Sequence, residues 1–124
     1  MKQMPIKRLA WVTDIHLNFL KDRQIQEFCR TVKEQQPDAV LIGGDIAEAP
    51  TLSAYLTTLE NELPCPIYFV LGNHDFYRGS ITGVRTEVEA LTRRSRRLVW
   101  LPSAGVVPLT ETAALIGHDG WADG

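Results

Sequence analysis

Short apolar runs alternate with helical patterns over most of the chain. The runs at 9–14, 39–45 and 67–73 each end in glycine or polar residues, as strands buried on both faces of a sheet do. They begin about 30 residues apart, which is the length of a strand–helix–strand unit. Because crossovers in such units are right-handed, the three strands are predicted to lie parallel, with their C-terminal ends at one edge of the sheet.

Three amphipathic helices are predicted around these strands. The first ends before Pro37, the second begins after Pro50, and the third covers 82–96. The apolar residues that recur at helical spacing are Ile25, Phe28, Cys29 and Val32 in the first helix, Leu52, Tyr55, Leu56, Leu59 and Leu63 in the second, and Val84, Val88 and Leu91 in the third. These residues are expected to face the core.

The pattern changes after residue 96. The runs RLVWL, GVVPL and AALIG are separated by only a few residues and predict strands of a hairpin or meander in a second sheet. The predicted fold class is therefore α/β, with an N-terminal βαβαβ parallel sheet and its helices followed by the start of a second sheet. The length of 124 residues suits a single domain, 1–124. We expect this domain to be truncated at its C-terminus, because the last strand ends in polar residues and little follows.

Composition and charge exclude several other classes of protein. The chain is 44% hydrophobic and 23% charged, as soluble globular proteins are, and its net charge of −2 gives no indication of nucleic-acid binding. No apolar run is long enough for a signal peptide or a membrane span, and the two cysteines do not form a C-x-x-C pair. These features predict a cytoplasmic protein with reduced thiols and no membrane partner.

Each of the first three predicted strands ends in side chains that can bind a metal ion. Each cluster alone is also compatible with an ordinary turn or helix cap, but their order and matching positions favour a shared site. Neighbouring strands lie about 4.8 Å apart, close to the spacing of paired catalytic metals, so a carboxylate on the middle strand could bridge two ions. The residues are, in chain order, Asp14 and His16, then Asp45, then Asn73, His74 and Asp75.

Three motifs carry a resemblance to a known family. The segments DIH at 14–16, GGD at 43–45 and GNHD at 72–75 resemble the first three motifs of the calcineurin-like metallophosphoesterases. The resemblance implies a four-layer α/β/β/α sandwich and a phosphoric ester hydrolase with two divalent ions. Its cofactors would be Mn, Fe or Zn, its nucleophile a metal-bound hydroxide, and its partner a phosphorylated substrate.

The resemblance also implies a role for each metal-binding residue. Asp14 and His16 would bind the first ion, Asp45 would bridge both ions, and Asn73 would bind the second ion through its amide oxygen.

The remaining residues of the third motif are implied to act on the substrate. His74 would stabilise or protonate the leaving group, and Asp75 would hold His74 in orientation. Tyr77 and Arg78 follow this motif and are candidates for a substrate pocket, although they could equally only pack the loop. His118 is open to three interpretations. It could be a plain loop residue, line the substrate pocket, or replace a missing metal ligand.

The sequence departs from the family pattern after the third motif. The whole chain has three histidines, where the family pattern uses five, and it contains no G-H-x-H. We therefore retain two alternatives to an enzyme that is complete in itself. The chain could be a non-catalytic scaffold, or a half-site that obtains the missing histidines from another chain. An exposed edge of an unfinished second sheet makes a homodimer a further candidate.

The arginine-rich run RRSRR at 93–97 is open to two interpretations. Its four arginines could attract a phosphate-rich partner. Their position at the C-terminus of a predicted helix favours solvated cations that complement the helix dipole.

Overall fold

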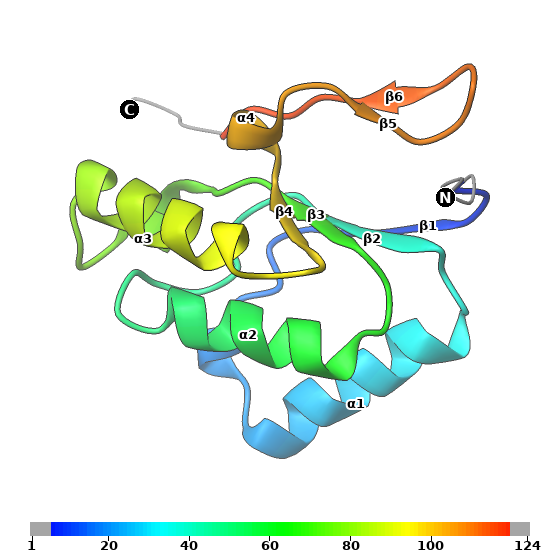
Figure 1. Ribbon diagram of the computed structural model, residues 1–124. Helices are drawn as coiled ribbons and strands as arrows, with labels where there is room; N and C mark the ends of the chain where they lie inside the picture. The colour runs from blue at the N-terminus through cyan, green and yellow to red at the C-terminus, as the bar shows by residue number, and fades with distance from the viewer. Residues whose placement is uncertain (1–5, 120–124) are drawn as a thin grey trace.

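The computed structural model describes residues 6–119, and a four-stranded parallel sheet organises them (Figure 1). The strands lie side by side in chain order, and their C-terminal ends are level, since Val12 pairs with Ile42 and Ile42 with Phe69. The predicted parallel arrangement of the first three strands is confirmed. Their bounds are β1 (Leu9–Val12), β2 (Ala39–Ile42), β3 (Ile67–Phe69) and β4 (Leu98–Trp100).

Three long helices cover one face of this sheet, as Figure 1 shows. They are α1 (Asp22–Glu34), α2 (Leu52–Glu62) and α3 (Ile81–Arg93). Most residues predicted to face the core are buried there together with the sheet: Ile25, Cys29, Val32, Leu52, Leu56, Leu59, Leu63, Val84, Val88 and Leu91. Phe28 and Tyr55 are only partly buried against this cluster. Within residues 6–119, no helix is long and apolar enough to cross a bilayer.

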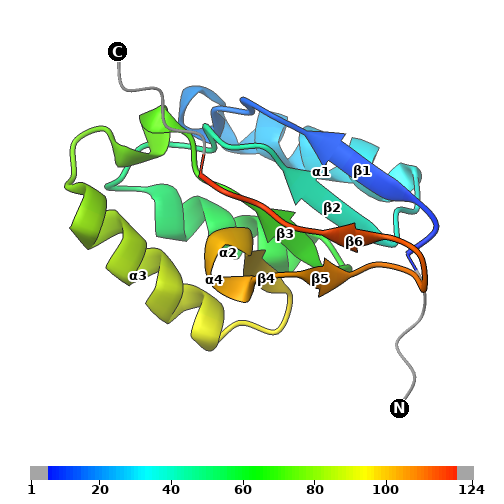
Figure 2. The same ribbon diagram turned by 90° about the horizontal axis from the view of Figure 1, so that it is seen from above.

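A smaller layer lies on the opposite face of the sheet. It consists of the short helix α4 (Leu101–Ala104) and an antiparallel pair, β5 (Val107–Pro108) and β6 (Ala114–Leu115) (Figure 2). Tyr68 of β3 and Leu101 of α4 are buried between the layers, with Val107 and Leu115 packed against them. The predicted hairpin of a second sheet is therefore present over GVVPL and AALIG.

The predicted placement of RLVWL in the second sheet is wrong. Its strand β4 pairs with β3 and is the fourth parallel strand of the first sheet. The physical reason is that α3 connects β3 to β4 as one more strand–helix–strand unit, and such a crossover returns the chain to the same sheet. The sequence reasoning also missed α4, a single turn with Pro102 in its first positions.

Part of the arginine-rich run packs against α2 instead of lying in solvent. The Arg97 guanidinium donates a hydrogen bond to the Glu60 backbone carbonyl. The Glu60 carboxylate accepts hydrogen bonds from the Ser95 hydroxyl and, at 3.1 Å, from the Arg97 backbone N–H. Burial would raise the pKa of Glu60, but these hydrogen bonds outweigh it and lower the pKa below its usual range. Glu60 therefore joins the end of α2 to the turn before β4.

The lowered pKa of Glu60 predicts a pH-dependent contribution to stability. Because the folded state holds this proton less tightly than the unfolded chain, the contribution is present above the unfolded pKa and is lost as the pH falls through the folded pKa. Chemical denaturation should show Glu60→Gln destabilised by about 1 kcal/mol at pH 7 and much less at pH 3. Glu34→Gln, at an exposed i,i+4 pair with Arg30, is the control and should change little. Equal losses for Glu60→Gln at both pH values would contradict the prediction.

Candidate metal centre

The loops that follow β1 and β2 run together beyond the end of the sheet. The Asp14 backbone N–H donates to the Gly44 carbonyl at 3.0 Å, and the His16 N–H donates to the Asp45 carbonyl at 3.0 Å. These bonds continue the pairing of the two strands into irregular backbone. As a result, Asp14 and His16 are held beside Asp45 at the C-terminal edge of the sheet, where ligands bind in parallel α/β proteins.

Three of these residues have backbone conformations that residues other than glycine rarely adopt. Asp14, His16 and Asp45 have φ angles of 53°, 43° and 51°, in the left-handed region. Asp and His enter this region more readily than most residues, but each such residue still costs on the order of 1 kcal/mol. The local chain therefore bears strain at the residues that the motifs single out.

Two glycines of the motifs permit the close approach of the loops. Gly44 has a φ of +107°, and a Cβ there would lie 2.8 Å from the backbone nitrogen of Gly72. A Cβ on Gly72 would overlap Oδ1 of Asp45. Glycine at these two positions thus lets the loop after β3 lie directly against Asp45.

The Asp45 carboxylate faces His74 through both of its oxygen atoms. Oδ1 accepts a hydrogen bond from the His74 backbone N–H at 3.0 Å, and Oδ2 lies 3.2 Å from Nδ1 of the His74 ring. Burial would raise the pKa of Asp45, but the hydrogen bond from the His74 backbone N–H outweighs it and lowers the pKa below the ordinary value. Asp45 therefore remains an anion at neutral pH.

His16, Asp45 and His74 form a cluster that could hold a metal ion. One ligand atom of each residue lies within 4.8 Å of the ligand atoms of the other two. The 3.2 Å approach of His74 Nδ1 to Asp45 does not have hydrogen-bond geometry, so this buried nitrogen has no hydrogen-bond partner among residues 6–119. A buried imidazole nitrogen without a partner, beside an ionised carboxylate and a second imidazole, fits a cation such as Mn, Fe or Zn.

The other two predicted ligands lie next to this cluster. Asp14 contacts Asp45, and its Oδ2 accepts a hydrogen bond from the Thr13 hydroxyl at 2.9 Å. Asn73 begins the single-turn helix η2 (Asn73–Phe76), directly after Gly72. The structure therefore brings residues of all three motifs to one edge, and the roles assigned to each residue remain predictions.

Asp75 binds backbone groups of two different loops. It is fully buried, and its Oδ1 accepts hydrogen bonds from the N–H groups of Ile46 and Ala47 at 2.8 and 2.9 Å. Its Oδ2 accepts from the Gly72 N–H at 2.9 Å. These bonds connect the loop after β2 to the loop after β3, and they position the neighbouring His74 through the backbone.

The environment of Asp75 also raises the pKa of its carboxyl group. Burial raises the pKa of this carboxyl to about 6, and the charge of Asp45 raises it as well, while the three backbone hydrogen bonds oppose the shift.

The residues considered for a substrate pocket are placed differently from one another. The Tyr77 ring lies edge-on to the His74 ring, with centroids 4.5 Å apart, so Tyr77 borders the cluster. Arg78 is exposed and lies 3.8 Å from Glu48. Nδ1 of His118 lies 3.0 Å from the backbone carbonyl of Asp119, and His118 is not part of the metal-capable cluster found among residues 6–119.

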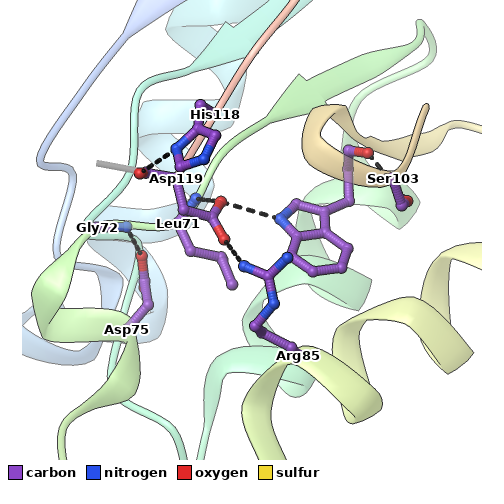
Figure 3. A network of polar contacts seen from close by, with 8 residues as sticks. Leu71, Gly72, Asp75, Arg85, Ser103, His118 and Asp119 are labelled. Carbon is purple, nitrogen blue, oxygen red and sulfur yellow. Dashed lines mark hydrogen bonds and ion pairs between the residues drawn. The ribbon is translucent and has the colours of Figure 1, made fainter. Parts of the chain in front are cut away.

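Sequence reasoning missed Asp119, which is nearly fully buried and takes part in the network of polar contacts drawn in Figure 3. Its Oδ1 accepts hydrogen bonds from the Leu71 N–H at 2.8 Å and from the Trp100 indole at 3.1 Å. Its Oδ2 pairs with Arg85 at 2.8 Å, and the Arg85 guanidinium lies over the Trp100 ring. Asp119 thus fixes the chain one residue before Gly72. The only sequence signal was an acidic residue after the last strand.

The raised pKa of Asp75 predicts how metal-free stability depends on pH. The folded state binds this proton more tightly than the unfolded chain, so the contribution is fully present below about pH 4 and is lost as the pH rises through about 6. In the presence of a chelator, wild-type unfolding free energy should fall relative to Asp75→Asn by up to about 3 kcal/mol between pH 4 and 7.

Asp38 provides a control of opposite sign for this measurement. Hydrogen bonds from the Lys7 and Arg8 N–H groups lower the pKa of Asp38, so wild type should gain stability relative to Asp38→Asn as the pH rises. Parallel pH profiles for wild type and Asp75→Asn would show that Asp75 does not titrate as described.

Comparison with known proteins identifies the family. Residues 7–122 match the family model of the calcineurin-like phosphoesterases. The chain is also 35% identical over 83 residues to a Pseudoalteromonas sp. (strain SM9913) protein named "Probable cyclic nucleotide phosphodiesterase". That match covers 55% of this chain and only 31% of the length of the relative. Since the family match extends over nearly all of the sequence, the chain belongs to the calcineurin-like phosphoesterase family.

Proposed function

We propose that this chain carries the metal-binding part of a phosphoric ester hydrolase with a binuclear metal centre. The observation that supports this most directly is the cluster of His16, Asp45 and His74, whose ligand atoms lie within 4.8 Å of one another at the C-terminal edge of the sheet. When bound, two divalent ions would neutralise phosphoryl charge and lower the pKa of a water molecule toward neutral pH.

The candidate ligands at the edge of the sheet would be shared between two ions. Asp14 and His16 would hold one ion, Asn73 would hold the other through its amide oxygen, and Asp45 would be a ligand of both. The ionised state of Asp45 and its central position between Asp14 and His74 support the bridging role. The mixture of nitrogen and oxygen ligands favours Mn, Fe or Zn.

His74 acts on the leaving group of the substrate. Its Nδ1 is turned toward Asp45, which leaves Nε2 as the nitrogen that can donate a proton to the departing ester oxygen. Asp75 holds His74 in place through the backbone of η2, since Asp75 is the next residue and is fixed by three hydrogen bonds.

A half-site is the second candidate function. Apart from His16 and His74, the sequence contains only His118, whose ring is turned toward the carbonyl of Asp119. In this case another chain supplies the missing histidines, and the protein alone holds one ion weakly.

The name of the Pseudoalteromonas relative supports a phosphodiester as the class of substrate. The match covers 31% of that protein.

Loss of the bridging carboxylate tests the assigned metal site. Asp45→Asn should abolish the uptake of Mn, because the amide cannot supply the bridging negative charge. The metal content per chain is measured by elemental analysis after incubation with Mn and desalting. Asp38→Asn, which changes a carboxylate just before β2, at the opposite end of that strand from Asp45, should retain the wild-type stoichiometry. Unchanged Mn content in Asp45→Asn would refute the assignment.

His74→Asn separates the two roles that the cluster allows for His74. If His74 acts on the leaving group, this variant should keep its Mn content and hydrolyse bis(p-nitrophenyl) phosphate about a hundredfold more slowly than the Mn-loaded wild type. Loss of Mn together with activity would identify His74 as a ligand.

A further inference from the structure

A continuous row of four rings crosses the candidate metal centre. Phe19 stacks on His16 with centroids 5.3 Å apart and an interplanar angle of 24°. His16 meets His74 at 5.0 Å, and His74 meets Tyr77 at 4.5 Å, both in edge-to-face geometry. We call Phe19, His16, His74 and Tyr77 the ring row.

The two outer rings of this row are exposed. Phe19 is 72% accessible to solvent and Tyr77 is 46% accessible, although both are large aromatic residues. His16 covers one face of the Phe19 ring, so the high exposure of Phe19 leaves its other face open. Exposed aromatic rings on both sides of a polar cluster are typical of a ligand-binding surface.

The backbone holds Phe19 in this outward position. Phe19 is the last residue of the 3-10 helix η1 (Leu17–Phe19), and its N–H donates to the His16 carbonyl at 3.0 Å. Leu17, at the start of this turn, is fully buried in the core. Burial of Leu17 therefore anchors the turn, while the Phe19 side chain at its other end is exposed.

We propose that the ring row binds a planar aromatic group esterified to the phosphate, and that the open face of Phe19 stacks on that group. This inference rests on the proposed function, which places the phosphate at His16, Asp45 and His74. Phe19 is one ring away from that cluster, at a centroid distance of 5.3 Å, which is within reach of an ester substituent. The substrate class is then a phosphoric ester of a nucleoside or of an aryl alcohol.

Binding of two phosphates that differ only in the base tests this inference. AMP and ribose 5-phosphate are titrated into the Mn-loaded chain by calorimetry. AMP should bind about five- to a hundredfold more tightly, because stacking of a base on an aromatic side chain contributes that much. Phe19→Ala should remove this difference and leave ribose 5-phosphate affinity and Mn content unchanged, whereas Phe19→Trp should restore it.

Trp11 offers a matched control for the loss of an exposed aromatic ring. It is also 72% accessible, but it lies in β1 and outside the ring row. Trp11→Ala should keep the preference for AMP.

A comparison of phenyl phosphate with methyl phosphate distinguishes the two sources of the aromatic group. Tighter binding of phenyl phosphate than of methyl phosphate would indicate that any aryl ester is accepted. A preference for AMP without a preference for phenyl phosphate would indicate nucleosides.

The outcomes separate this inference from the proposed function. If ribose 5-phosphate binds and AMP binds no more tightly, the stacking role of Phe19 is refuted while the phosphate site stands. The same holds if Phe19→Ala weakens both ligands equally. If neither phosphate binds the Mn-loaded chain, the proposed phosphate site fails, and the inference fails with it.

Discussion

A single buried carboxylate fixes the two loops from which the candidate metal centre is built. Asp75 accepts hydrogen bonds from the N–H groups of Ile46, Ala47 and Gly72, which lie beyond the ends of β2 and β3. Without Asp75, these N–H groups would lose this partner next to the core, at a cost of about 1–3 kcal/mol for each that is left unsatisfied. Asp45 precedes Ile46 and His74 precedes Asp75, so the same contact also sets the distance between the Asp45 carboxylate and the His74 ring.

The sequence predicted those parts of the fold that depend on local periodicity. The three βα segments and their buried helix faces follow from apolar spacing, and the shared edge follows from the handedness of the crossovers. The strand β4 was assigned to the wrong sheet because its three residues carry no periodic signal of their own. Asp119 could not be found, because its partner Leu71 lies 48 residues away in the sequence. The same limitation hid the ring row, because His16 and His74 are far apart in the sequence and meet only in the fold.

Backbone strain and the proposed metal ligands coincide at the sheet edge. Among residues 6–119, five non-glycine residues have positive φ angles, and three of them are the proposed ligands Asp14, His16 and Asp45. A fold retains such strain where the surrounding hydrogen bonds over-determine the conformation, as the paired loops after β1 and β2 do here. The rings on either side, Phe19 and Tyr77, border the same edge, and we propose that they recognise the ester group.

The central claim is that a divalent ion binds at the C-terminal edge of the parallel sheet. Anomalous diffraction from crystals of the Mn-loaded chain, recorded at the manganese edge, tests it most directly. The account predicts a peak within bonding distance of a ring nitrogen of His16 and a carboxylate oxygen of Asp45. A peak only at surface carboxylates, or no peak in crystals whose Mn content matches one ion per chain, would contradict it.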